Sequence, residues 1–199
     1  MVPTNRKQAV PRSRNRGTNY PRSAVFAFVS IPSPVSGVPI VIQNAVITLA
    51  GLVLGGRRGF FVGLLFIVLG LVGLPVLAGG RSVISALPGP TVGYIVGYLI
   101  SPAIGGAVAY RAPRNKTGLA IMITVAGFVS LLIQYACGTV GLALRAGMGW
   151  GEAALAQIPF LGPDALKLVI MIIIAIGVHS AFPDLMGRKP VTKKAESAA

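Results

Sequence analysis

Acidic residues are scarce in this chain: four Asp and Glu occur in 199 residues, against 18 Lys and Arg. A soluble domain covers its surface with charges of both signs, but charged residues make up only 11% of this chain. Hydrophobic residues make up 54%, in runs that approach the ~20 residues an α-helix needs to cross a bilayer. The composition excludes a water-soluble domain and predicts an all-α integral membrane protein.

Cysteine and histidine are almost absent as well. The single cysteine, Cys137, excludes an internal disulfide and an all-cysteine metal site, and one histidine, His179, with four acids is too few for a metal cluster. The chain has neither a Gly-x-Ser-x-Gly motif nor a phosphate-binding loop. We therefore expect no enzyme, no catalytic residue, no metal and no cofactor. Uphill transport would need partner proteins or an ion gradient.

The net charge of +14 does not indicate a nucleic-acid partner. Lys and Arg lie at the two ends of the chain and in short breaks between apolar runs, so they do not form one basic face. This distribution is typical of the cytoplasmic ends of membrane helices, and membrane lipid is the expected surrounding partner. We expect residues 1–22 to be a basic, disordered cytoplasmic tail, 23–187 the membrane domain, and 188–199 a second basic cytoplasmic tail.

The apolar runs predict six membrane helices, the first of which is short or irregular because Pro32 and Pro34 stop it. With the amino terminus inside, 15 of the 18 Lys and Arg residues are cytoplasmic, and only Arg81, Arg145 and Lys167 are outside. This asymmetry predicts two cytoplasmic termini in a multi-pass protein of a bacterial plasma membrane. The runs are 24–31, 38–56, 59–78, 92–110, 118–137 (extending toward 144) and 165–182.

Three connections, at 32–39, 79–91 and 138–164, fall on the outer side of this topology. Pro163 suits the first position of a helix, which would put Asp164 and Lys167 on one helical face. This ion pair either compensates the charge of a helix start or binds a ligand. The unusual polar residues thus gather on one side and predict an outward-facing ligand pocket.

Three further polar residues also allow two interpretations. The amide of Gln43 can bond a neighbouring helix or a ligand. Tyr94 can belong to the aromatic belt at the membrane surface or to the wall of a pocket. Arg81 can be a solvated loop charge or the partner of an anionic ligand.

Four motifs, in this order and spacing, resemble the BioY family, the biotin-binding S components of energy-coupling factor transporters. The resemblance runs from about Val35 to Ile170, and the second and third motifs together are its most specific part. The motifs are Val38-Pro39-Ile40 with Gln43, Leu74-Pro75-Val76-Leu77-Ala78-Gly79-Gly80, Gly89-Pro90-Thr91-Val92-Gly93-Tyr94, and Pro163-Asp164-x-x-Lys167.

The resemblance implies a six-helix protein that captures biotin at the outer face and releases it inward. Its implied partners are biotin, a transmembrane coupling subunit and two ABC-type ATPases. Asp164 would accept hydrogen bonds from the ureido N–H groups, and Lys167 would donate to the ureido oxygen or to the carboxylate. Tyr94 would pack the bicyclic body, and the glycine-rich loop would close over it. The implied binding residues are Gln43, Gly79, Gly80, Arg81, Pro90, Thr91, Tyr94, Asp164 and Lys167.

One feature departs from the family pattern. The family's first helix carries small residues four apart that meet the coupling subunit, whereas Ala24 and Ala27 are three apart in a short segment. Two alternative functions remain at this point. One is an S component for another small vitamin. The other is a structural membrane protein without a ligand, in which Asp164→Asn and Lys167→Ala alter stability and leave vitamin uptake unchanged.

Overall fold

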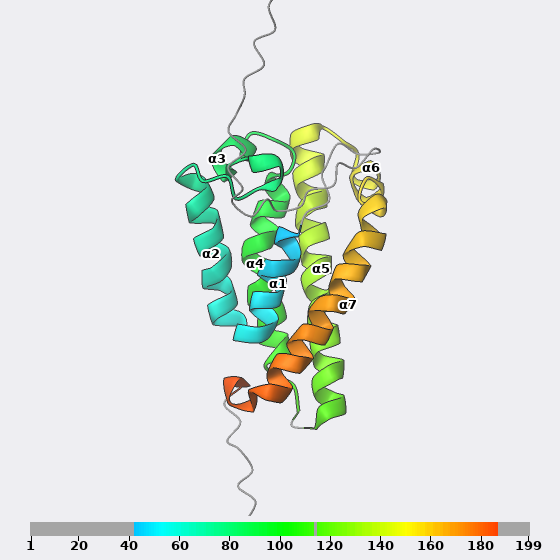
Figure 1. Ribbon diagram of the computed structural model, residues 1–199. Coiled ribbons are helices and arrows are strands. Elements are labelled where there is room, and N and C mark those ends of the chain that lie inside the picture. Colours follow the sequence, from blue (N-terminus) through cyan, green and yellow to red (C-terminus); the bar gives the residue numbers. More distant parts are fainter. Residues whose placement is uncertain (1–41, 114, 187–199) are drawn as a thin grey trace, which may run out of the picture.

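The computed structural model describes residues 42–113 and 115–186 (Figure 1). Within these ranges the chain is helical, and its only β-structure is an isolated bridge between Leu77 and Arg81. Both predicted tails and the predicted first helix lie outside the described residues. The helices are α1 (Gln43–Leu54), α2 (Gly56–Leu71), η1 (Ala78–Gly80), α3 (Val83–Ala86), α4 (Val92–Ala109), α5 (Lys116–Ala146), α6 (Trp150–Leu155), α7 (Ile158–Ala181) and η2 (Pro183–Met186).

Three of the described helices, α4, α5 and α7, are long and apolar enough to cross a membrane. The run from 92 agrees with the sequence prediction, α5 includes the predicted extension toward 144, and α7 is longer than predicted. α5 continues through Gly138 to Ala146, and α7 begins at Ile158. The prediction of an irregular connection over 138–164 is therefore wrong, because most of that segment is helical.

The position predicted for Pro163 is also wrong. The helix start is marked by Pro159, in the first turn of α7, and Pro163 lies one turn further in. Asp164 and Lys167 are therefore inside the helix and do not cap it. The interpretation of this pair as a helix-start device loses its basis, since the dipole effect is confined to the first turn.

The α1–α2 corner is made by Gly55, whose φ of 86° is a left-handed conformation that favours glycine. Tyr110, at the end of α4, packs its ring against Gly55, and its hydroxyl donates to Val53 O at 2.8 Å. The break therefore lies just before Arg57 and Arg58, the two residues that separate the predicted runs 38–56 and 59–78. At its other end α2 stops at Leu71 and not at Ala78, because Gly73 has a φ of 102°.

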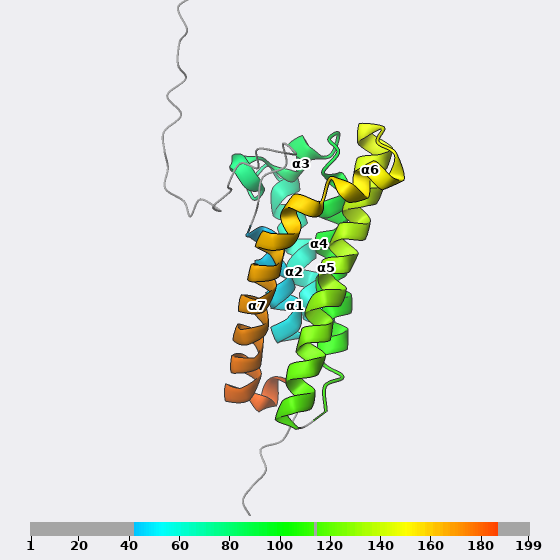
Figure 2. The ribbon, with the colours of Figure 1, turned by 90° about the vertical axis from the view of Figure 1, so that its right-hand side faces the viewer.

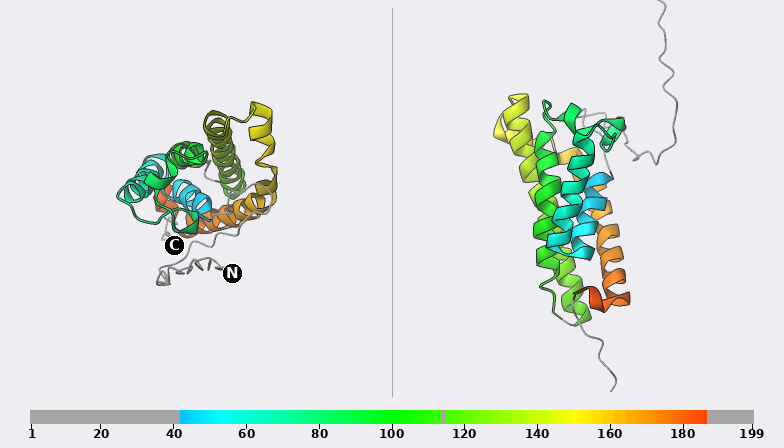
Figure 3. Two further views of the ribbon diagram at one scale, coloured as in Figure 1. Left: turned by 90° about the horizontal axis from the view of Figure 1, so that it is seen from above. Right: turned by 90° about the vertical axis from the view of Figure 1, so that its left-hand side faces the viewer.

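α1 lies in the middle of the bundle and contacts α2, α4, α5 and α7 (Figures 2 and 3). Glycines allow the closest approaches. A Cβ on Gly51 of α1 would lie 2.5 Å from Pro102 O of α4, and one on Gly93 of α4 would lie 2.0 Å from Cys137 O of α5. These contacts are backbone to backbone, as is typical of helices packed through small residues in membranes.

Two sets of connections mark the opposite ends of the bundle. α3, with the segment around residues 74–91, and α6 lie at one end; the α1–α2 corner and η2 lie at the other (Figure 1). Arg81 and Arg145 belong to the first end, and Arg57 to the second. The predicted outer pocket region and the start of α7 thus lie at the same end of the bundle, where the polar site is found.

Candidate functional site

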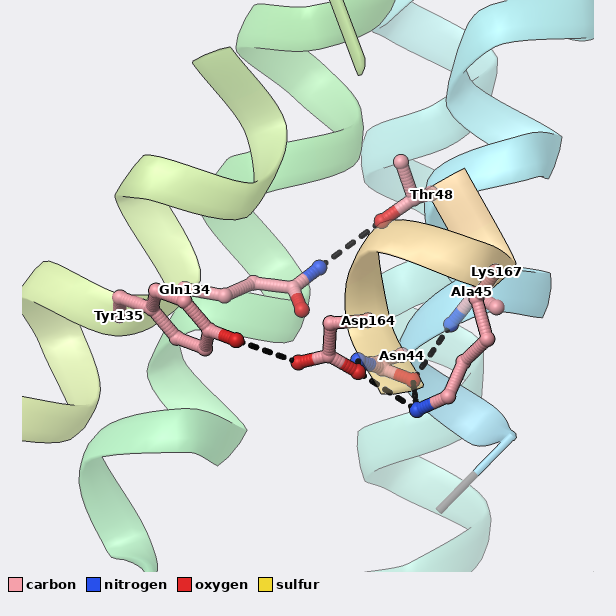
Figure 4. A network of polar contacts seen from close by, with 7 residues as sticks. All are labelled: Asn44, Ala45, Thr48, Gln134, Tyr135, Asp164 and Lys167. Carbon is pink, nitrogen blue, oxygen red and sulfur yellow. Dashed lines mark hydrogen bonds and ion pairs between the residues drawn. The ribbon is translucent and has the colours of Figure 1, made fainter. Parts of the chain in front are cut away.

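The centre of the site is the ion pair between Asp164 and Lys167 on α7 (Figure 4). Lys167 Nζ lies 2.6 Å from Asp164 Oδ1, and the two side chains are only 16% and 6% exposed. Asn44 of α1 bridges the pair: its Nδ2 donates to Asp164 Oδ1 at 3.2 Å, and its Oδ1 accepts from Lys167 at 3.4 Å. A charge pair this far inside an apolar bundle needs such partners, since unpaired charges are costly to bury.

Two tyrosines extend the network across the pocket. The Tyr135 hydroxyl of α5 donates to Asp164 Oδ2 at 2.8 Å, and the Tyr94 hydroxyl of α4 donates to Gln157 Oε1 at 3.0 Å. Gln157 is buried between α6 and α7, and its Nε2 donates to Tyr135 O at 3.1 Å and to Thr139 Oγ1. Gln157 therefore fixes Tyr94 and the α5 backbone beside the ion pair.

Gln134 of α5 forms part of the pocket beside the ion pair and is 3% exposed. Its Nε2 donates to Thr48 Oγ1 at 2.8 Å and to Ser101 Oγ at 2.9 Å, so both amide hydrogens are used within the bundle. Figure 4 shows the amide oxygen of Gln134 turned away from Thr48. Hydrogen bonds to α1 and α4 therefore fix the orientation of the Gln134 amide, and its oxygen remains available as an acceptor.

Gln43, at the start of α1, is 1% exposed and also lines the pocket. Its Nε2 donates to Val76 O at 3.1 Å, which ties α1 to the segment after α2. Its Oε1 is buried and accepts no hydrogen bond from the described residues. A buried acceptor without a donor costs free energy unless a ligand or water supplies one.

These side chains surround an open cavity with a volume of about 100 Å³. Apolar side chains such as Leu77, Ile95 and Phe160 make up much of its wall, as is usual for small-molecule sites. The structure brings six of the nine predicted binding residues to this cavity: Gln43, Arg81, Thr91, Tyr94, Asp164 and Lys167.

The other three predicted residues do not line the cavity. Gly79 and Gly80 are exposed, with φ of 72° and 73°, and a Cβ on either would have nothing within 4 Å. The two glycines shape the loop that carries Arg81, and their backbone does not form part of the cavity wall. Pro90 is exposed, and its carbonyl lies next to Gly141 of α5. The close approach of this loop to a ligand stays a prediction.

Arg81 lies at the mouth of the cavity, in contrast to the buried ion pair. Its side chain is exposed, and Nη2 donates to Ser85 O at a long 3.4 Å. The cavity thus has a buried end with Asp164 and Lys167 and a solvated end with a guanidinium. This arrangement suits a small ligand with an apolar body, a neutral polar group at one end and an anion at the other.

Several lining residues were missing from the predicted site: Asn44, Tyr98, Gln134, Tyr135 and Phe160. Asn44 directly follows Gln43 and Tyr98 lies one helical turn after Tyr94, so the sequence offers a signal for both. Gln134 is an amide in the middle of a long apolar run, which is a signal of function in a membrane helix. No pattern in the sequence singles out Phe160.

Comparisons with known proteins identify the family. The BioY family model matches residues 22–184, which includes the predicted first helix. The chain is 31% identical over 176 residues to a biotin transporter BioY of Rhizobium etli, covering 83% of this chain and 93% of that one. It is 36% identical over 151 residues to a biotin transporter BioY of Rhodobacter capsulatus, covering 70% and 77%.

A solved structure shares the fold. It is the S-component for biotin from an ECF-type ABC transporter, with a TM-score of 0.67 and 25% identity, covering 76% of this chain and 80% of that one. The family match extends over more of the chain than the resemblance from Val35 to Ile170 had indicated. The apolar helices, the motifs and these matches agree, and this membrane protein belongs to the BioY family.

Proposed function

We propose that this chain is the biotin-binding S component of an energy-coupling factor transporter. It captures biotin at the outer face and releases it inward together with a transmembrane coupling subunit and two ABC-type ATPases. The observation that carries the proposal is the buried Asp164–Lys167 pair inside an otherwise apolar cavity. The names of the relatives and of the matching structure support it.

The two ends of the cavity give biotin an orientation. Its carboxylate is strongly hydrated, and at the buried end the attraction of Lys167 is offset by the repulsion of Asp164, so we place it beside the exposed Arg81. Its ureido group is neutral and carries two N–H donors and one oxygen acceptor. At the buried end Asp164 accepts from an N–H group, and Lys167 donates to the oxygen. Hydrogen bonds to charged groups are about twice as strong as neutral ones.

A second acceptor completes the match to the ureido group. Its two N–H groups need two acceptors, and Asp164 already accepts from Lys167, Asn44 and Tyr135. Gln43 Oε1 is buried and accepts nothing from the described residues, while its Nε2 is held by Val76 O. The fixed NH2 group prevents the amide from turning its donors toward biotin, and Gln43 Oε1 becomes the second acceptor.

The proposed topology has six spans, with both termini in the cytoplasm of a bacterial cell. The positions of the charges support it. The α1–α2 corner and the α4–α5 connection lie at one end of the bundle and carry Arg57, Arg111 and Lys116. Arg81 and Arg145 lie at the opposite end. The excess of basic residues marks the cytoplasmic side. The mouth of the cavity then opens to the outside, where biotin is captured.

Binding of labelled biotin to the purified full-length protein tests the proposed function. We expect saturable binding of one biotin per chain that unlabelled biotin competes away. An excess of riboflavin or thiamine should not compete, because neither carries a ureido group on a small apolar bicycle. Equal competition by these vitamins would identify an S component of another specificity. A lack of saturable binding would favour a structural protein.

The orientation makes a prediction about Arg81. Arg81→Gln should weaken the binding of biotin by roughly three- to five-fold, because an exposed ion pair contributes up to about 1 kcal/mol. The same substitution should leave the binding of biotinamide unchanged, since this analogue has a neutral tail. Equilibrium binding of both ligands to both proteins measures the difference. An equal loss for biotin and biotinamide would contradict the assignment of the carboxylate to Arg81.

A further inference from the structure

A second cavity lies on the opposite side of the α4–α5 pair from the biotin pocket. α4 turns Tyr94, Ile95 and Tyr98 toward the pocket, whereas Val92 and Val96 line the second cavity. Its volume is about 330 Å³. The two cavities therefore share the same two helices, which lie next to each other in the view from above (Figure 3), but they have different walls. We refer to the second one as the α4–α5 groove.

The floor and the walls of this groove have different origins. The floor is formed where Gly93 and Gly141 bring the two backbones together; a Cβ on Gly141 would lie 2.6 Å from Gly93 N. The walls are exposed aliphatic side chains: Val96 is 47% exposed, Val140 43% and Leu144 70%. The described lining is apolar apart from one charged group at one end, Arg145.

The length of α5 places this charge at the level of the lipid headgroups. Its 31 residues span about 46 Å, against about 30 Å for the hydrocarbon of a bilayer, so both ends reach the polar region. Arg145 is in the last turn and exposed. From Cys137, which also lines the groove, to Arg145 the helix rises about 12 Å. The groove thus runs from the hydrocarbon up to the headgroup region.

We propose that the α4–α5 groove binds one anionic phospholipid, with an acyl chain along the groove and its phosphate on Arg145. No acidic residue lines the groove, and Arg145 forms no ion pair with the described residues. An arginine presents a planar fork of donors that suits a phosphate. The charge therefore selects an anionic headgroup, while the aliphatic walls accept any acyl chain.

A second copy of the chain fits the groove less well. A two-fold interface sets the same patch against itself. Both Arg145 side chains would then meet across it, and the groove offers no acid to separate their charges. An anionic lipid removes this repulsion and fills a cavity that is too apolar to hold ordered water. The site is independent of biotin, and it would stand even if the proposed function failed.

Native mass spectrometry of the purified full chain, titrated with phosphatidylglycerol or phosphatidylcholine, tests this lipid site. We expect one phosphatidylglycerol to bind about five-fold more tightly than phosphatidylcholine, since an anionic lipid gains about 1 kcal/mol per basic residue. Arg145→Gln should reduce phosphatidylglycerol to the level of phosphatidylcholine. Val140→Trp should fill the groove and reduce both. The matched control, Arg111→Gln at the other end of the bundle, should behave as wild type.

Three results would overturn the proposal. The first is equal binding of both lipids to the wild-type protein. The second is an Arg145→Gln variant that keeps its preference for phosphatidylglycerol. The third is a dimer without lipid preference that Val140→Trp converts to monomer, which would assign the groove to a second copy. Arg145→Gln is a surface substitution, so it decides the question even if Val140→Trp does not fold. A thermal unfolding temperature equal to that of the wild type shows that the bundle of each variant is intact.

Discussion

Asp164→Ala is expected to weaken biotin binding by roughly 30-fold to more than 1,000-fold, which corresponds to about 2–5 kcal/mol. Asp164 accepts hydrogen bonds from Lys167, Asn44 and Tyr135 in a site where it is 6% exposed. Its removal takes away the charged acceptor for the ureido group. It also removes the carboxylate that lies 2.6 Å from the Lys167 ammonium, which makes the empty pocket itself less favourable.

Lys167 provides the matched comparison for this prediction. Lys167→Met, which preserves the length of the side chain, should cost at least about 1.5 kcal/mol of binding free energy, because a charge-assisted hydrogen bond is lost. The Asp164→Asn/Lys167→Met double variant should lose less than the sum of the two single variants, since the residues contact each other. Calorimetry measures the biotin affinity of each variant, and thermal unfolding measures its stability separately.

The alternative structural role predicts the opposite pattern. If the pair only holds α7 against α1 and α5, both single variants lower the unfolding temperature and leave the dissociation constant for biotin unchanged. Unchanged affinity in the folded Asp164→Asn protein would therefore remove the pair from the ligand site. A loss of affinity with little change in the unfolding temperature would assign the pair to biotin.

The long helices could be predicted from the sequence because an apolar run of this length rarely folds as anything other than a helix. α4 begins at the predicted residue, Val92, and ends one residue before the predicted end. The outer end of α5 lies two residues beyond the predicted extension toward 144, whereas α7 begins at Ile158, before the helix start predicted at Pro163. Gly138 lies inside α5, and its lack of a side chain leaves room for the Tyr94 ring, 2.4 Å from the position of a Cβ. Pro163 is tolerated one turn into α7.

The site could be predicted only in part, for a related reason. Asp164 and Lys167 stand out because charged residues inside an apolar run need a purpose. Gln134 and Tyr135 are adjacent, yet both reach the pocket, and this depends on how α5 is rotated against α1, α4 and α7. Gln157 lay in a segment predicted as a loop. Its role required α6 and the start of α7 to fold around it.

The contact between α4 and α5 is the place where the smallest substitution should have a large structural effect. Gly93→Ala would put a methyl group 2.0 Å from Cys137 O, and backbone cannot rotate away as a side chain can. The two helices must separate, and overpacking of this kind costs about 1–3 kcal/mol. Gly93 also precedes Tyr94, which lines the cavity proposed to bind biotin, so biotin affinity should fall together with stability.

Gly151→Ala is the matched control, because a Cβ at this position in α6 has nothing within 4 Å. Alanine is also the better helix former by about 1 kcal/mol, so this variant should unfold at the same temperature as the wild type or slightly higher. Thermal unfolding in detergent, with and without biotin, measures both proteins. If Gly93→Ala unfolds at the same temperature as Gly151→Ala, the close approach of α4 and α5 does not determine stability. If stability falls but affinity does not, the helices separate on the side of the groove and leave the pocket intact.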